Sequence, residues 1–401
     1  MKTLHPLQNL AINRKRGLAF GICSICSASE HVILAAMDRA AAYNTYLLIE
    51  STANQVNQFG GYTGMRPKDC RDFVFNLASR AHFPRRRIIL GGDHLGPLVW
   101  KNEKAASAMK KAEELVREYA LAGFTKLHLD TSMRLGDDPP DGRPDDAVIA
   151  ERAAGLCRVA ENAFEEAASL SARNGQNQGE GPACLVYVVG SEVPIPGGSD
   201  EAEETVRVTG AADFRNTVET FGKAFEAAGL NDAWRRVIAV VVQPGVEFGD
   251  EYIRQYNRDE ARALCQALKD YPDMVFEGHS TDYQTPECLK RMVEDGIAIL
   301  KVGPALTFAL REALFALSHM ENELFRRGME LSRFMETLEE AMLKNPDNWK
   351  KHYRGDEDKL RLCRKYSFSD RCRYYLPEPE VRASIGRLIK NLSGLRIPFR
   401  L

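Results

Sequence analysis

An aspartate and a histidine stand side by side at the end of a short apolar run of this sequence. The run Arg87–Gly91 has the composition of a buried strand, and Asp93 and His94 follow it in a turn flanked by glycines. Neighbouring residues of an extended strand point to opposite faces, so we expect these two side chains to diverge. One would bind a metal ion while the other transfers a proton. The alternative is a surface turn capped by the aspartate.

Two further histidines come near the ends of other apolar runs. His279 lies just past its run, as His94 does, and both could converge over one end of a parallel sheet. Imidazole nitrogens combined with carboxylate or amide oxygens suit zinc or a similar divalent cation. We therefore favour a metal site over a pair of merely hydrogen-bonded histidines. His128 alternates with Lys126 and Asp130 and shares their face, so we expect it to play a supporting or structural role.

Several carboxylates near these histidines could act as a general acid or base. Burial beside a metal ion and other carboxylates would shift their pKa values toward neutrality. Asp93 and Glu192 are the strongest candidates, with Asp130 as a third. For any single one, the alternative is an orienting hydrogen bond to a neighbouring turn. The carboxylates that compete for the same role are Glu50, Glu277 and Asp282.

A repeating pattern of strands and helices must position these residues. The apolar, β-branched runs are Leu18–Cys23, Tyr46–Glu50, Arg87–Gly91, Lys126–Asp130, Leu185–Val189, Val237–Gln243, Met274–Glu277 and Ala298–Val302. Segments with helical periodicity, such as Ala105–Leu121, alternate with them and predict a parallel α/β sheet covered on both sides. Eight units indicate a closed (β/α)8 TIM barrel. An open doubly wound sheet is the alternative, but no G-x-G-x-x-G follows the first run.

All of the apolar runs end in polar or glycine-rich residues, as the active-site face of a barrel does. Small residues there let backbone N–H groups approach a phosphate. The candidates for contacting the substrate or its phosphate are Glu50, Asn54, Gln55, Gly60, Gly61, Ser280, Thr281, Asp282, Lys301 and Gly303.

Beyond the last run the sequence is mainly helical. Helical periodicity covers about Ala305–Arg327 and Leu331–Leu343. We assign residues 1–310 to the barrel that carries the site. Residues 311–401 form a helical C-terminal extension, used for packing, as a lid or for contacts between subunits.

The composition excludes several classes of protein. A net charge of -2 over 401 residues does not favour binding to nucleic acid or to an anionic membrane. The first residues lack the apolar core of a signal peptide, and no apolar run approaches the ~20 residues that span a bilayer, so we expect a cytoplasmic protein. Nine scattered cysteines indicate reduced thiols. We interpret Cys23 and Cys26 as a buried pair at a strand end rather than a redox or zinc site.

Six segments carry longer and more specific motifs. They are Gly21–Ala28 (GICSICSA), Asn54–Gly64 (NQVNQFGGYTG), Gly91–Pro97 (GGDHLGP), Val241–Phe248 (VVQPGVEF), His279–Gln284 (HSTDYQ) and Leu300–Arg311 (LKVGPALTFALR). Together they resemble the D-tagatose-1,6-bisphosphate aldolase accessory-subunit family, which is also labelled tagatose 6-phosphate kinase. The resemblance implies a phosphorylated ketohexose as the ligand. Some stand-alone relatives are 4-epimerases that interconvert fructose 6-phosphate and tagatose 6-phosphate.

A more distant resemblance is to class II, metal-dependent aldolases. It implies that Asp93 is the catalytic acid or base and that His94 and His279 are metal ligands. Glu192, with the glycines after it, resembles a second conserved element of those enzymes, and Gln243 stands where they place a histidine. The ligand set implied is His94, His279, Gln243 and Glu192, holding zinc or else manganese, cobalt or nickel. An amide is a weaker ligand than an imidazole, so Gln243 would lower metal affinity.

Two functions follow from these resemblances. The first is a metal-dependent sugar-phosphate 4-epimerase that works by retro-aldol and aldol steps and forms a homo-oligomer. The alternative is a non-catalytic subunit that stabilises a catalytic aldolase subunit. A kinase fits poorly, because the sequence has no G-x-x-x-x-G-K-[ST] phosphate loop.

Overall fold

The computed structural model describes residues 4–140, 142–173, 184–191, 206–324, 330–395 and 397. The chain divides into two compact units. The first contains the chain up to Val302 except for two inserted segments, and the second contains Phe248–Ile253 and Gly303–Leu401 among its parts.

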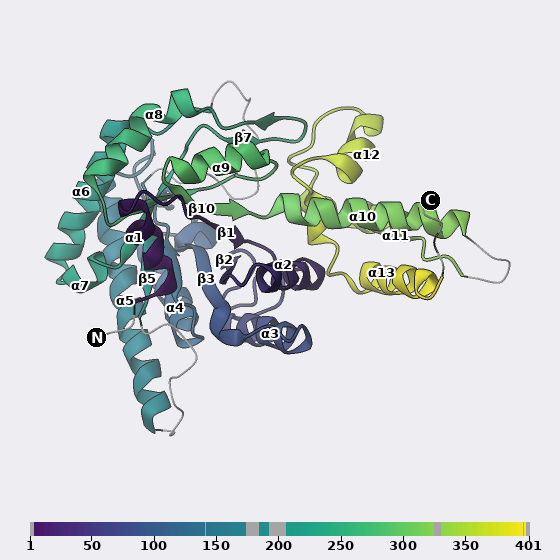
Figure 1. Ribbon diagram of the computed structural model, residues 1–401, viewed down its shortest axis with the longest axis horizontal. Helices are drawn as coiled ribbons and strands as arrows, with labels where there is room; N and C mark the ends of the chain where they lie inside the picture. The colour runs from purple at the N-terminus through teal and green to yellow at the C-terminus, as the bar shows by residue number, and fades with distance from the viewer. Residues whose placement is uncertain are drawn as a thin grey trace. The chain divides into compact units, whose positions relative to one another are not determined.

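The first unit is a closed barrel of parallel strands surrounded by helices (Figure 1). The order around the barrel is β1-β10-β9-β6-β5-β4-β3-β2, so each strand lies beside its neighbours in the chain, and the predicted TIM barrel is confirmed. The barrel strands are β1 (Ile22–Ile25), β2 (Leu47–Thr52), β3 (Ile88–Leu95), β4 (Lys126–Leu129), β5 (Val186–Val189), β6 (Val237–Val242), β9 (Val275–Gly278) and β10 (Ile297–Val302). Outside the barrel, β7 (Glu247–Phe248) and β8 (Ile253–Arg254) are two-residue strands.

Helices connect the barrel strands and bury an apolar stripe against them. In α4, residues Ala108, Ala112, Leu115 and Tyr119 are buried at spacings of three and four, as expected for an amphipathic helix. The barrel helices are α2 (Glu30–Ala42), α3 (Pro67–Arg80), α4 (Ala105–Leu121), α5 (Asp146–Arg173), α6 (Ala211–Ala227), α7 (Asn231–Trp234), α8 (Arg258–Ala267) and α9 (Pro286–Glu294). Short 3-10 helices lie at Arg85–Arg87, Pro97–Trp100 and Leu268–Asp270. The first strand begins at Ile22 rather than at the predicted Leu18, because Leu18 and Phe20 are exposed.

An N-terminal segment closes the end of the barrel where the strands begin. A 3-10 helix (Pro6–Gln8) and α1 (Asn9–Lys15) place Leu7, Leu10 and Ala11 in one apolar cluster with strand residues such as Leu48 and Ile299. The buried His5 lies at its start, and its Nε2 is 3.1 Å from Thr125 Oγ1, just before β4. Apolar residues of the N-terminal segment therefore fill the end of the barrel interior where the strands begin.

The second unit has its own apolar core, built around Phe334, Tyr375, Val381 and Leu388. Its helices are α10 (Pro304–Glu323), α11 (Phe334–Lys344), α12 (Glu357–Tyr366) and α13 (Pro379–Leu392), with 3-10 helices at Pro346–Asn348 and Arg371–Tyr374. No helix in the described part of the chain is both long enough and apolar enough to span a membrane.

The buried His5 makes the stability of the barrel depend on pH. Its Nδ1 accepts a hydrogen bond from Leu7 N, which leaves Nε2–H to face Thr125 and fixes a neutral ring. Burial lowers the pKa of His5 to about 3. An unfolded histidine has a pKa of about 6.5, so the unfolded chain binds the proton more tightly and stability falls as the pH drops below that value. Between pH 7 and pH 5 we expect His5 to remove about 2 kcal/mol of unfolding free energy.

Urea unfolding at the two pH values checks this expectation. His5→Asn keeps an acceptor for Leu7 but has no proton to gain, so its loss of stability between pH 7 and pH 5 should be smaller by about 2 kcal/mol. Equal losses in the two proteins would contradict the assignment.

Candidate functional site

The half of the barrel interior near the strand ends is filled with charged side chains. Glu50 on β2, Lys126 on β4, Glu277 on β9 and Lys301 on β10 are all buried, with at most 5% of each residue exposed. Charges at such depth are tolerated only when each one has an oppositely charged partner. The contacts of these four residues therefore define the floor of the site.

Their charges alternate along a continuous line of ion pairs. Lys126 Nζ lies 2.6 Å from Glu277 Oε2 and 2.7 Å from Glu50 Oε1. Lys301 Nζ lies 2.7 Å from Glu50 Oε2 and 2.8 Å from Asp93 Oδ1. Glu50 and Lys301 are predicted substrate contacts, but in the structure their charged atoms are already occupied by these pairs.

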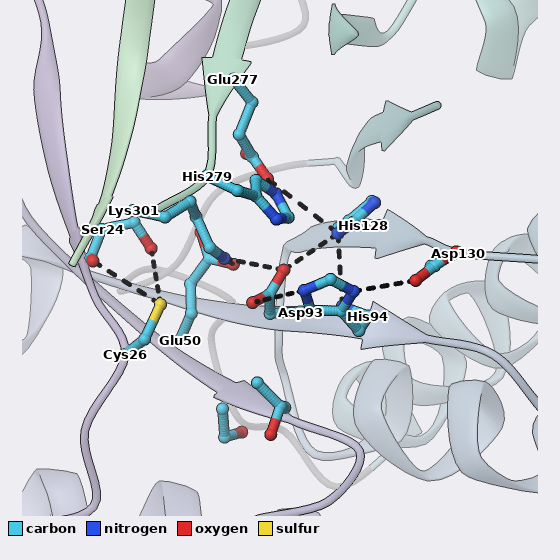
Figure 2. A network of polar contacts seen from close by, with 12 residues as sticks. Ser24, Cys26, Glu50, Asp93, His94, His128, Asp130, Glu277, His279 and Lys301 are labelled. Carbon is cyan, nitrogen blue, oxygen red and sulfur yellow. Dashed lines mark hydrogen bonds and ion pairs between the residues drawn. The ribbon is translucent and has the colours of Figure 1, made fainter. Parts of the chain in front are cut away.

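Above this floor, three histidines and Asp93 form a compact cluster (Figure 2). The ring centres of His94, His128 and His279 are 4.9–5.3 Å apart. One nitrogen or oxygen from each of these four residues lies within 4.8 Å of the others. The structure thus brings together the predicted Asp93, His94 and His279. It adds His128, which sequence reasoning placed outside the ligand set.

Asp93 and His94 face the same cluster, so the prediction that they diverge is wrong. His94 has a φ of +47°, a left-handed conformation that is uncommon for a residue with a side chain. The register between β3 and β4 also shifts between Gly92 and Leu95. This break in the strand turns the imidazole to the same side as the carboxylate, and backbone strain of this kind is concentrated at functional sites.

Each of the three histidines lies within hydrogen-bond distance of a carboxylate, and for His128 the pair is Nδ1 with Asp93 Oδ1 at 2.9 Å. His94 Nδ1 is 2.8 Å from Asp130 Oδ2, while Ser132 holds the other oxygen of Asp130 through its N–H and its hydroxyl. Figure 2 shows the ring of His94 between Asp130 and Asp93. Its Nε2 is left 3.8 Å from Asp93 Oδ2, too far for a hydrogen bond. His279 Nε2 lies 3.1 Å from Glu277 Oε1 in the same type of pair.

The electrostatics of the cluster keep its acids ionised. Burial alone would raise the pKa of Asp93, but the charges of His94 and Lys301 outweigh it and hold the pKa well below its usual range. For the same reason the pKa of Asp130 falls to about 2, where His94 opposes the effect of burial. Burial lowers the pKa of His279 to about 4, so this ring is neutral at pH 7 and its lone pair is available as a ligand.

The donor set and its charge fit a divalent cation. Within the described residues, the buried carboxylates Glu50, Asp93, Asp130 and Glu277 lie against two lysines, so two negative charges remain to be balanced by a protonated imidazole or by a bound cation. His128 Nε2 is buried and has no hydrogen-bond partner within the described residues. Imidazole donors oriented by carboxylates are the usual arrangement in zinc sites. His94, His279, His128 and Asp93 are therefore the residues that could hold a metal ion.

Other predicted residues lie elsewhere. Gln243 follows β6, but its Oε1 accepts hydrogen bonds from Gly245 N and Val246 N, so it caps its own turn. Glu192 lies outside the residues that the structure describes. Thr281 donates to the carbonyl oxygen of Lys301, and Asp282 is buried. Two of the predicted phosphate contacts are Ser280 and Gly303. Ser280 follows His279 directly, and Gly303 belongs to the second unit.

The loop after β2 is held by its own hydrogen bonds. Gln55 Oε1 accepts from Thr52 N, while Asn54 is exposed. A side chain on Gly61 would come within 2.4 Å of Gln55 O, and its φ is +54°, so this turn requires glycine. Gly60 and Gly61 remain predicted phosphate contacts on the basis of sequence.

The two cysteines on β1 and just after it differ from their predicted burial. Cys23 is exposed. Cys26 is partly buried, and its Sγ is 3.6 Å from Ser24 Oγ. None of the cysteines in the described part of the chain forms a disulfide.

Residues 7–401 match the family described as D-tagatose-1,6-bisphosphate aldolase subunit GatZ/KbaZ-like. The chain belongs to the GatZ/KbaZ-like family. It is 49% identical to the D-tagatose-1,6-bisphosphate aldolase subunit GatZ of Klebsiella pneumoniae over 98% of this chain and 89% of that protein. Identity to the Salmonella typhimurium subunit of the same name is 48%, with the same coverage.

A solved structure agrees with the GatZ/KbaZ-like assignment. The crystal structure of a probable tagatose 6 phosphate kinase from Sinorhizobium meliloti has a TM-score of 0.84 and 46% identity, over 94% of this chain and 89% of that one. The family resemblance predicted from the six sequence segments is therefore confirmed.

Asp130 provides a direct test of how the cluster is oriented. Asp130→Asn keeps the size of the side chain but removes the charge that holds His94 Nδ1–H. Partners of this kind typically change metal affinity by about 10–100-fold, so we expect zinc binding to weaken by that factor. Competition with a chromophoric chelator measures it, and an unchanged zinc affinity would show that Asp130 does not orient a ligand.

Proposed function

We propose that this chain acts as a subunit of a D-tagatose-1,6-bisphosphate aldolase, together with a separate catalytic aldolase chain. The observation that supports this is the near-complete match to proteins named as that subunit, at 48–49% identity over 98% of the chain. Its ligand would be a phosphorylated ketohexose.

The buried cluster supports a second function, a metal-dependent 4-epimerase acting on tagatose 6-phosphate and fructose 6-phosphate. A chain that only stabilised a partner would have no need for oriented histidines and an ionised aspartate at the mouth of its barrel. The specific observation is the grouping of Asp93, His94, His128 and His279 within 4.8 Å. This arrangement provides both cation donors and a proton acceptor.

In such an epimerase, His94 and His279 would hold the divalent ion, with His128 or Asp93 completing the set. Zinc suits these donors best, with manganese, cobalt or nickel as alternatives. When bound, the ion would draw electron density from a substrate carbonyl, which favours enediolate formation at C2 and C3. Glu192 remains a proposed ligand on the basis of sequence. Gln243 could join only by giving up its hydrogen bonds to Gly245 and Val246.

Asp93 is the proposed proton acceptor, through Oδ2. Its Oδ1 is fixed by Lys301 at 2.8 Å and by His128 Nδ1 at 2.9 Å, which leaves Oδ2 directed toward His94. The ionised carboxylate would take the proton of the C4 hydroxyl while the C3–C4 bond breaks and its electron pair stays on C3. The aldehyde fragment then turns its other face to C3. The bond forms again, and Asp93 returns the proton to the C4 oxygen.

An assay of the protein alone tests the epimerase. Purified protein loaded with zinc should convert fructose 6-phosphate to tagatose 6-phosphate, followed by NMR. His94→Ala should reduce the rate at least about 100-fold, because even partners one step from a metal cost 10–100-fold. His31→Ala, at an exposed position on α2, is the matched control and should leave the rate unchanged. No turnover with zinc, manganese, cobalt or nickel would contradict the epimerase.

A mixing experiment tests the subunit role separately. Adding this chain to a purified catalytic aldolase subunit should lengthen the half-life of tagatose-bisphosphate cleavage activity at elevated temperature. Asp93→Asn should give the same protection, because support of a partner does not need the proton acceptor. If the aldolase is neither bound nor protected, the subunit role is wrong.

A further inference from the structure

Glu50 and Lys126 lie one layer below the histidine cluster and contribute no atom to it. Each one, however, holds a residue that contacts the cluster. Glu50 Oε2 holds Lys301 at 2.7 Å, and Lys301 in turn holds Asp93 Oδ1. Lys126 holds Glu277 at 2.6 Å, and Glu277 holds His279. Lys126 Nζ and Glu50 Oε1 are 2.7 Å apart. Through their ion pairs, these two side chains therefore link Asp93, the proposed proton acceptor, to His279, a proposed metal ligand.

The backbone of β3 makes room for this pair. Gly91 is level with Glu50 on one neighbouring strand and with Lys126 on the other. A side chain on Gly91 would begin 2.7 Å from Glu50 Cγ and 3.3 Å from Lys126 Cδ. The absence of a side chain at residue 91 therefore lets the two charged groups meet inside the barrel.

Charge sharing explains what the pair does. Lys301 divides its positive charge between Glu50 and Asp93. Without the carboxylate of Glu50, Asp93 is the one close ion-pair partner left to Lys301 among the described residues, which draws the aspartate toward Lys301 and away from a cation. Attraction of this kind is strong in a buried site because the effective dielectric constant is low.

We propose that Glu50 and Lys126 are positioning residues that set the geometry of Asp93 and His279 for cation binding. The inference rests on the metal site of the proposed epimerase and names residues that lie outside it. It gives Glu50 a role different from the substrate contact that its sequence position predicts.

Zinc binding to the intact chain, measured with zinc alone by chelator competition, tests the proposal. Glu50→Gln keeps the shape of the side chain and should weaken zinc binding by about 10–100-fold. The visible spectrum of the cobalt-substituted protein should also change, because the donors around the ion move. The matched control is Glu161→Gln, which removes a carboxylate from the ion pair with Arg236 outside the barrel and should change neither measurement.

Two further variants separate positioning from net charge. Glu50→Gln/Lys126→Met has the same net charge as the natural chain, so wild-type zinc affinity in this variant would overturn the proposal in favour of a simple charge effect. Gly91→Ala keeps every charge but displaces Glu50, and it should also weaken zinc binding. Gly91→Ala also tests the proposal if Glu50→Gln does not fold.

The results separate a failure of the proposed metal site from a failure of the positioning role of Glu50 and Lys126. If the natural chain does not bind zinc, the proposed metal site and this inference both fail. If the natural chain binds zinc and both Glu50→Gln and Gly91→Ala bind it equally well, with unchanged cobalt spectra, only the positioning role is wrong. Thermal melting of each variant shows whether a loss of binding arises from a loss of folded protein.

Discussion

The structure depends on one constraint, that charges buried inside a barrel must be matched by charges of opposite sign. Removing a carboxylate or an ammonium group from water costs several kcal/mol, which is recovered only through close and well-oriented partners. The alternating line from Glu277 through Lys126, Glu50 and Lys301 to Asp93 meets this requirement. It divides the barrel interior into two parts. The end where the strands begin is apolar and closed by Leu7 and Leu10, and the end where they finish is ionic and carries the cluster.

Much of the fold follows from the sequence alone. Strands that are buried on both faces need continuous apolar, β-branched residues, so runs such as Val237–Val242 stand out without any structural information. The Ala105–Leu121 helix is equally plain, because its apolar residues repeat with helical spacing. The first strand was harder to place. Leu18 and Phe20 continue its apolar pattern, but they lie on the surface.

The site was predictable in its residue types and less so in its geometry. Asp93, His94 and His279 could be selected because they end apolar runs, but their directions depend on local backbone angles. One left-handed residue, His94, was enough to reverse the expected divergence of two neighbours. The place of His128 in the cluster could have been suspected from its alternation with Lys126 and Asp130. The sequence does not predict that the side chain of Gln243 accepts hydrogen bonds from its own turn, because an amide can serve equally as a cap or as a ligand.

The ionic layer also has a consequence for how the barrel comes together. Its members come from strands at both ends of the chain's barrel region, and Lys301 and Glu50 are 251 residues apart. A fragment ending before β9 would contain Glu50 and Asp93 but neither Lys301 nor Glu277. It would bury two acids with Lys126 as the only ammonium group of the layer. Such a fragment, which lacks β9 and β10, is electrostatically incomplete, so we expect the barrel to assemble as a single cooperative unit rather than in early and late parts. Because these contacts are so distant in sequence, the last step of closure is also expected to be slow.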